Sequence, residues 1–406
     1  MASAEPRRAA IAFIFITVVL DILALGVVIP VLPILIQDFV GGDTARAATM
    51  VGVFGTVWAL MQFVCAPILG ALSDRFGRRP VILISCTGLG LDYVLMALAP
   101  SLAWLLVGRV ISGITSASFS TAGAYIADVT PPEKRAAGFG MIGAAFGLGF
   151  VLGPALGGVL GSVDPRLPFW ISAALALTNA AYGYFVLPES LPPDRRRPLA
   201  WGRMNPLGTL SVLRAHAGLA GLATVAFIAH LAHHVLTSVF VLYANYRYQW
   251  DERATGLTLA AVGVMSVIVQ GGLVRPLVAR FGERTMLLVG LLGGVAGHAI
   301  YATASTSSAF VMGIPVFALM GFLNPSLQGL MTRRVAAGEQ GRLQGINGSL
   351  MGLAGIVGPA IFSSTFALAI GPRTSWSLPG APFLLAAGLL AVAWAVAWRV
   401  TMETTP

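Results

Sequence analysis

The sequence predicts an all-α membrane protein with twelve transmembrane helices in two pseudo-symmetric six-helix bundles. Three observations support this prediction: a charge-poor composition, a succession of long apolar segments, and a repeat that relates the two halves. Of the 406 residues, 57% are hydrophobic and only 10% are charged. Soluble domains carry about 25% charged residues, so lipid and not water must cover much of this surface.

The predicted helices are twelve apolar segments, and one hydrocarbon crossing requires roughly 20 helical residues. Charged or Pro/Gly-rich breaks separate the segments, whose approximate ranges are 9–36, 47–69, 80–99, 101–125, 136–160, 167–188, 217–243, 254–279, 285–304, 308–332, 343–370 and 380–400. The first segment runs past Asp21 to Ile36 without a small-residue cleavage site. We therefore expect it to remain as a span and not to be removed as a signal peptide.

The longest break follows the sixth segment and is rich in proline and arginine. It predicts an N-terminal bundle of residues 1–188, a central cytoplasmic linker of residues 189–216 and a C-terminal bundle of residues 217–406. A cytoplasmic N-terminus would leave only a minority of the 25 Lys and Arg residues on the outer side, namely Arg46, Arg166, Arg247, Arg253 and Arg373. Because basic loops stay cytoplasmic, we expect both termini on that side. The formal charge of +9 is explained in this way and does not indicate nucleic-acid binding.

A repeat relates the two halves of the chain. The segment Leu69–Leu83, LGALSDRFGRRPVIL, recurs as Val274–Leu288, VRPLVARFGERTMLL. The offset that superposes these segments also carries Gly153-Pro154 onto Gly358-Pro359. Two stretches that agree on one offset predict a duplicated six-helix unit. In such an architecture two bundles rock around a site near the bilayer midplane.

Ionisable residues inside the spans are the first candidates for function, because each costs roughly 3 kcal/mol on insertion scales. Asp21 lies in the first span, Asp92 in the third and Arg109 in the fourth. A carboxylate in apolar surroundings can bind and release a proton, and a nearby arginine can tune it. We therefore assign all three residues to proton coupling. The alternative is a structural role, in which Asp21 bridges helices and Arg109 is permanently paired.

Other polar residues inside the spans predict a substrate path. His230 and His234 are one helical turn apart, so they share a helix face. Ordinary hydrogen bonding between helices is the alternative for this pair, and two histidines alone do not define a metal site. We also place Gln62, Gln328 and Asn347 on the path.

The loop after the second span, GALSDRFGRRP from Gly70 to Pro80, is the most specific motif. Its glycines permit a tight cytoplasmic turn, and Asp74 can accept hydrogen bonds from a helix N-terminus or from an arginine. We predict a charge clasp that holds one face of the protein closed. The gating loop would consist of Gly70, Asp74, Arg75, Gly77, Arg78 and Arg79. The alternative is a solvated basic loop.

The fifth span is dense in glycine. Gly149, Gly153, Gly157 and Gly158 permit close contact with a neighbouring helix. Pro154 frees a backbone carbonyl and allows a bend. We expect tight packing that also serves as a hinge or a seal.

These motifs resemble the major facilitator superfamily and, within it, the drug:proton antiporters. The loop from Gly70 to Arg79 resembles the family signature after the second span, Arg109 with Gly113 resembles the span-four motif, and the glycine-rich fifth span resembles the antiporter motif. Strings that are similar to the tetracycline efflux pumps are Leu20-Asp21 through Pro33, Met61-Gln62-Phe63, Leu91-Asp92-Tyr93, Tyr125-Ile126-Ala127-Asp128, Pro188-Glu189-Ser190 and Leu343-Gln344-Gly345.

The resemblance implies a major facilitator fold and proton-coupled export of a drug-like small molecule. A tetracycline-type antiporter is favoured, and the alternative is an exporter of an endogenous metabolite or sugar. Where those pumps carry a His and an Asp implicated in proton coupling, this chain has Ser266 and Gly294. His298 lies one turn beyond Gly294, so we add it to the proton-coupling residues.

We expect no enzymatic activity, because the sequence offers neither a nucleophile–base set nor a G-x-x-x-x-G-K-[ST] nucleotide loop. No resident cofactor or metal is expected. The proton gradient would supply the energy, and a divalent cation could be carried with the substrate. The expected partners are a small molecule, protons and lipid. We expect a monomer that crosses the bacterial inner membrane many times.

Overall fold

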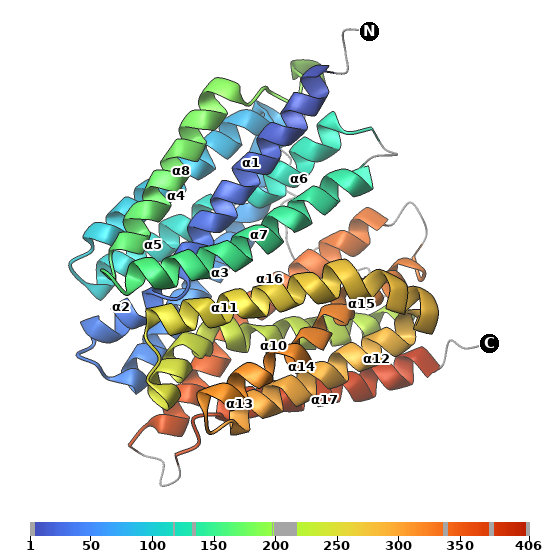
Figure 1. The fold of residues 1–406 in the computed structure, drawn as a ribbon. Helices are drawn as coiled ribbons and strands as arrows, with labels where there is room; N and C mark the ends of the chain where they lie inside the picture. Colours follow the sequence, from blue (N-terminus) through green and yellow to red (C-terminus); the bar gives the residue numbers. More distant parts are fainter. Residues whose placement is uncertain are drawn as a thin grey trace. The chain divides into compact units, whose positions relative to one another are not determined.

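The fold is built from helices (Figure 1). The computed structural model describes residues 5–116, 118–131, 135–196, 198, 217–335, 340–372 and 377–402, and no strand occurs within these ranges. The first half contains α1 (Glu5–Val28), α2 (Leu32–Phe39), α3 (Thr44–Phe76), α4 (Arg78–Leu98), α5 (Leu102–Thr115), α6 (Ser118–Val129), α7 (Arg135–Gly161), α8 (Leu167–Val186) and the short 3-10 helix η2 (Pro193–Arg195).

The second half contains α10 (Ala217–Tyr248), α11 (Glu252–Val267), the π-helix η5 (Ile268–Leu273), α12 (Val274–Thr303), α13 (Ser307–Met312), α14 (Ile314–Ala318), the 3-10 helix η6 (Leu319–Phe322), α15 (Leu323–Thr332), α16 (Gln340–Ile370) and α17 (Ala381–Met402). The predicted all-α class is thereby confirmed for the described part of the chain.

The predicted spans correspond to helices in the structure. Within the described residues, ten helical stretches are long and apolar enough to cross a membrane. One of them, Glu252–Thr303, holds the eighth and ninth predicted spans, which meet at Gly282 with φ 79°. The fourth predicted span corresponds to the shorter apolar helix α5 followed by α6. Each of the twelve predicted spans therefore has a helical counterpart.

Three spans that the sequence presents as continuous are interrupted. The first divides into α1 and α2 around Pro30, because proline lacks the N–H that an internal helical position must donate. The fourth divides at Ser116, the C-cap residue that follows α5. The tenth is a series of short elements from α13 to α15, with Gly313 and Pro315 at the first junction.

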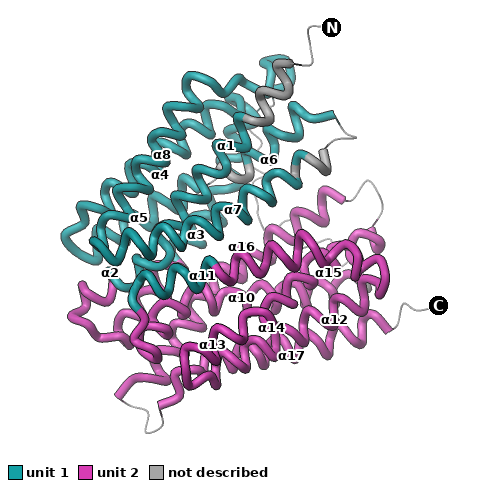
Figure 2. Tube along the Cα trace, viewed as in Figure 1, with its two compact units in different colours: residues 1–35, 57–205, 251–260 teal, residues 36–56, 206–250, 261–406 magenta. Residues whose placement is uncertain are grey.

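The chain forms two compact units (Figure 2). Unit 1 comprises Met1–Leu35, Val57–Asn205 and Asp251–Ala260, and unit 2 comprises Ile36–Thr56, Pro206–Trp250 and Ala261–Pro406. Two short segments thus group with the opposite half of the chain: the start of α3 joins unit 2 and the start of α11 joins unit 1. The predicted boundaries at 188 and 217 stay a prediction, because most of the linker lies outside the described residues.

The sequence repeat is visible in the structure. The offset that carries Gly77 onto Gly282 joins two glycines with positive φ, 109° and 79°, and almost equal ψ, 159° and 160°. Within unit 1, α1 packs against α7 and α4 packs against α8. The matching pairs in unit 2 are α10 with α16 and α12 with α17. Each unit therefore repeats the same helix pairings around the same loop conformation.

Candidate transport sites

Asp92 on α4 and Arg109 on α5 form a buried ion pair in unit 1, with 3.8 Å between Arg109 Nη2 and Asp92 Oδ2. Their exposed fractions are 1% and 7%. Arg109 also donates to the sulfur of Met96 at 3.3 Å. Neither carboxylate oxygen accepts a hydrogen bond within 3.5 Å among the described residues, although the hydroxyl of Ser112 on α5 lies close enough to act on Asp92. The structure thus brings two sequence candidates together and leaves the carboxylate able to accept a proton or a donor group.

The close approach of these two residues depends on a glycine. A Cβ atom added at Gly108 would lie 2.7 Å from Asp92 Oδ1 and 2.6 Å from Met96 Cγ. Both contacts are shorter than real Cβ contacts, so any larger residue at this position would push Asp92 away from its present place. The glycine before Arg109 is therefore part of the site.

Asp21, on α1, belongs to a different cluster. Asn179 of α8 donates from Nδ2 to Asp21 Oδ1 at 3.0 Å and to the Thr17 carbonyl at 2.9 Å. The Cys86 thiol of α4 lies 3.6 Å from the same carboxylate. Asp21 therefore ties three helices of unit 1 together. Asn179 was not selected from the sequence, although an amide in an apolar span is the signal that could have found it.

The predicted gating loop is organised by Arg78. Its guanidinium contacts Asp74 at 2.5 Å, Ser73 Oγ at 2.6 Å and Asp128 of α6 at 3.1 Å. Asp74 therefore pairs with an arginine one turn further along the chain. Asp128 was not predicted from the sequence to contact this loop.

Glu189, which follows α8, completes the same cluster. Its carboxylate accepts the backbone N–H of Arg78 at 2.9 Å and of Arg79 at 3.3 Å. These groups are the free donors at the start of α4, where a carboxylate also interacts favourably with the helix dipole. Arg79 donates to the Tyr184 carbonyl, so a second contact joins the loop to the end of α8.

The other residues of the predicted gating loop make local contacts. Gly77 holds the positive φ that turns the chain into α4, a conformation that favours glycine. The Arg75 guanidinium stacks over the Phe76 ring at 5.2 Å. The Gly70 carbonyl accepts the Ser73 hydroxyl at 3.0 Å.

The glycine-rich fifth span packs through two faces of α7. On one face, Cβ atoms added at Gly149, Gly153 and Gly157 would meet Ile22, Gly26 and Val27 of α1 within 3.0 Å. On the other face, a Cβ at Gly158 would lie 2.9 Å from Gly256 Cα of α11. Pro154 lies between these faces, inside the helix. The motif therefore permits backbone-to-backbone contact on both sides within unit 1.

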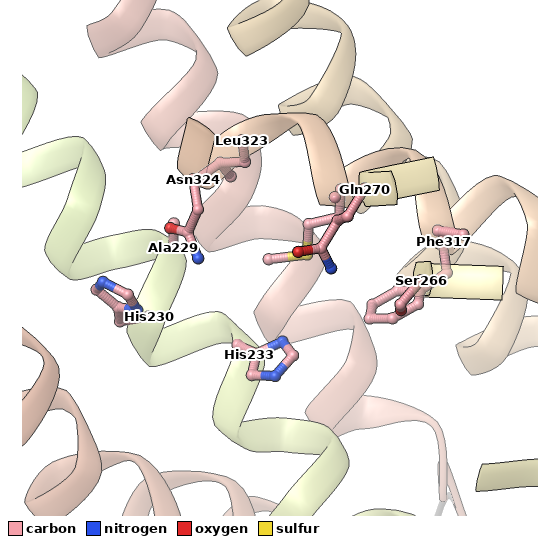
Figure 3. Close-up of a pocket in the computed structure, with 11 residues that line it drawn as sticks. Ala229, His230, His233, Ser266, Gln270, Phe317, Leu323 and Asn324 are labelled. Carbon is pink, nitrogen blue, oxygen red and sulfur yellow. The ribbon is translucent and has the colours of Figure 1, made fainter. Parts of the chain in front are cut away.

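Unit 2 contains a cavity of about 130 Å³ between α10, α11, η5, α14, η6 and α15 (Figure 3). Polar side chains line it together with a thioether and a phenyl ring, and the lining residues are Ala229, His230, His233, Ser266, Gln270, Phe317, Ala318, Met320, Gly321, Leu323 and Asn324. A volume of this size holds a few water molecules or one polar group of a ligand.

The histidines of α10 do not share the face that helical periodicity suggested. His230 lines the cavity and so does His233, which the sequence argument did not select. His234 is turned to α16, where a Cβ added at Gly358 would lie 2.6 Å from His234 Cβ. Gln328 of α15 and Asn347 of α16 are in unit 2 and Gln62 of α3 is in unit 1, and none of them lines this cavity.

His298 of α12 is fully buried behind the cavity. Its Nδ1 lies 2.7 Å from the Gly294 carbonyl, so Nδ1 carries the proton and donates to it. Nε2 has no partner among the described residues. The ring packs 5.2 Å from the Phe317 ring, which lines the cavity.

Comparison with known proteins identifies the class. The family model of the Major Facilitator Superfamily matches residues 14–359, and the chain belongs to this family. This membership confirms the predicted fold and the prediction of a transporter in place of an enzyme.

Within this family, the chain is similar to several proteins with known names. The tetracycline resistance protein of class C from Escherichia coli is 38% identical over 86% of this chain and 88% of its own length. The class D protein from Salmonella ordonez is 34% identical over 91% of both chains. Among solved structures, the human organic anion transporter MFSD10 (TETRAN) is 25% identical, covers 97% of this chain and 99% of its own, and has a TM-score of 0.72.

Proposed function

We propose that this protein is a proton-coupled exporter of tetracycline-like small molecules. The observation that carries the proposal is the 38% identity to the class C tetracycline resistance protein over most of both chains. Five further tetracycline resistance proteins, of classes D, E, H, G and B, match at 32–36% identity. An exporter of an endogenous metabolite or sugar is less well supported, because relatives at this level carry tetracycline resistance in their names.

The buried residues support a coupled mechanism. Asp92 is paired with Arg109 at 3.8 Å, and its oxygens accept no hydrogen bond from the described residues, so it can bind a proton inside the membrane. Arg109 can stabilise the carboxylate after the proton leaves. We assign proton coupling to this pair, with Asp21 and His298 as further candidates. Asp21 is already held by Asn179, which favours a structural role for it.

The cellular setting belongs to the same proposal. We place the protein in the bacterial inner membrane as a monomer, with both termini in the cytoplasm. Lipid, protons and the exported molecule are its partners. We propose that a divalent cation is carried only as a complex with the substrate. Transport assays with and without Mg²⁺ would test this.

Transport into inside-out membrane vesicles tests the function. Vesicles that contain the protein should accumulate tetracycline when respiration generates a proton gradient, and a protonophore should abolish the accumulation. Vesicles without the protein are the control. A substrate panel with tetracycline, an unrelated antibiotic and a sugar distinguishes the substrate classes. Sugar accumulation without tetracycline accumulation would contradict the proposal.

A further inference from the structure

Four of the five histidines of the chain lie on two helices of unit 2, α10 and α12. His230, His233 and His234 lie on α10, and His298 lies on α12. His233 interacts electrostatically with each of the other three. The proposed function uses only His298 of this cluster, so the role of the others is open.

The environments of the four histidines differ, and they favour His233 as the one that exchanges a proton with the cavity. His298 is enclosed by aromatic rings and its Nδ1 is committed to the Gly294 carbonyl, while His234 faces α16. Figure 3 shows the imidazoles of His230 and His233 on the side of α10 that faces Asn324 and Gln270. His233 and His230 both line the cavity, and the His233 side chain has the larger accessible fraction of the two. His233 therefore combines a place in the cavity lining with electrostatic interaction with the other three imidazoles.

The cavity can hold a single positive charge. Among its lining residues there is no Asp, Glu, Lys or Arg, and the polar groups that line it together with His233 are His230, Ser266, Gln270 and Asn324. His298 interacts with His233 electrostatically from α12. The hydroxyl and amide oxygens can accept the two N–H groups of an imidazolium. A second proton on a neighbouring histidine is opposed by like-charge repulsion. The cluster is suited to one proton at a time.

We propose that His233 is the proton-binding group of unit 2, and that a hydroxyl donor of the exported molecule competes with the proton for the same ring nitrogen. This inference rests on the proposed export function. Neutral His233 accepts the O–H of the ligand. When a hydronium ion delivers its proton to that nitrogen, an N–H bond forms, a water molecule is left, and the ligand hydroxyl loses its acceptor. Return of the proton to water restores the neutral ring.

Proton release on ligand binding tests this competition. Purified full-length protein in detergent, at mildly acidic pH and with little buffer, is mixed with tetracycline in the presence of a pH-sensitive dye. The wild-type protein should release protons as tetracycline binds. His233→Gln keeps an acceptor oxygen but cannot be protonated, so it should bind tetracycline without releasing protons. Its affinity should not weaken as the pH falls, whereas wild-type affinity should.

Three further variants define the outcomes. His216→Gln removes the histidine that lies in the predicted linker, and it should release protons as the wild type does. His233→Asn replaces His233→Gln if the latter does not elute as a single species. Equal release from wild type and His233→Gln, or loss of release only in His298→Gln, overturns the proposal. Absence of release from wild-type protein that binds tetracycline also overturns it.

Transport separates this inference from the proposed function. In inside-out vesicles, His233→Gln should lose tetracycline accumulation against its gradient and keep downhill exchange. If wild-type vesicles accumulate no tetracycline, the exporter proposal fails. If the purified wild-type protein still binds tetracycline, the proton-release comparison then decides the role of His233 separately from the exporter proposal.

Discussion

Arg78 and Asp128 form an ion pair with 3.1 Å between Nε and Oδ2, and the repeat reproduces this pair in unit 2 with the charges exchanged. The offset that carries Gly77 onto Gly282 carries Arg78 onto Glu283 and Asp128 onto Arg333. Glu283 Oε1 lies 3.1 Å from Arg333 Nη2. Each unit therefore joins its loop to the end of a nearby helix by the same contact, although the sequence similarity is lost at both positions.

The two pairs differ in burial, so removing them should have different costs. Arg78 and Asp128 are 11% and 24% exposed at their side chains, whereas Arg333 is 75% exposed. Asp128→Asn should destabilise the protein by about 1–3 kcal/mol, because a charged hydrogen bond at a largely buried guanidinium is lost. Arg333→Gln should cost about 0–1 kcal/mol, as solvent screens an exposed pair. Thermal unfolding in detergent measures both, and equal losses would contradict the burial argument.

Asp74→Asn should slow transport and leave substrate binding intact. Asp74 contacts Arg78 in the loop, and substrates of such folds bind near the bilayer midplane. The substitution weakens a clasp that holds the loop against its neighbours, so it should affect the change between conformations. Initial rates in vesicles and equilibrium tetracycline binding to purified protein are the two measurements. Lost binding with a normal turnover of bound molecules would refute the clasp.

Glycines of α7 provide a matched pair for testing helix contact. A Cβ at Gly153 would lie 2.6 Å from Gly26 Cα, whereas a Cβ at Gly143 would meet nothing within 4 Å. Gly153→Ala should therefore force α1 and α7 apart and lower the unfolding temperature and the transport rate. Gly143→Ala should be neutral or stabilising by up to about 1 kcal/mol, because alanine favours the helix. Equal effects at the two sites would show that backbone contact is unimportant.

The predicted topology places both termini in the cytoplasm, since most basic residues then lie on that side. Single cysteines introduced at Ser3 and Thr404, in a variant with Cys65→Ser and Cys86→Ser, should be labelled by a membrane-impermeant maleimide in inside-out vesicles. They should stay unlabelled in intact cells. Labelling of either terminus in intact cells would contradict the topology. Retained tetracycline transport by the cysteine-free parent is the control for folding.

The helices were predictable because apolar length and loop charge specify them directly, whereas side-chain neighbours depend on packing between helices. Periodicity grouped His230 with His234, since residues three and four positions apart are both neighbours on a helix. Contact with Gly358 of α16 turns His234 away and leaves His233 at the cavity. Local sequence does not contain that information.

Contacts between residues far apart in the chain are a second feature that the sequence did not predict, and Glu189 is an example. Its string was noted for its resemblance to the efflux pumps, but its partners at the start of α4 are more than one hundred residues earlier in the chain. Asp92 and Arg109 were predictable as candidates because charge inside a span is rare. That they contact each other, and that Gly108 makes room for them, required the structure.

Asp92→Asn should abolish accumulation of tetracycline against its gradient while downhill exchange continues. Asp92 is the buried carboxylate of unit 1 that lacks hydrogen bonds to both oxygens among the described residues, so it can bind a proton. Gradient-driven uptake in inside-out vesicles measures the effect, with Asp21→Asn and His298→Gln as the rival coupling positions. Near-normal uptake by Asp92→Asn would exclude Asp92 as a coupling residue.

A second variant separates coupling from charge balance. Asp92→Asn leaves Arg109 buried without its carboxylate, which costs about 3–5 kcal/mol and is enough by itself to disable the protein. The double variant Asp92→Asn/Arg109→Gln removes both charges and should recover membrane levels and thermal stability. If Asp92 carries the proton, the stable double variant still cannot concentrate tetracycline. If Asp92 only neutralises Arg109, the double variant regains uphill transport, and the coupling role passes to the remaining candidates.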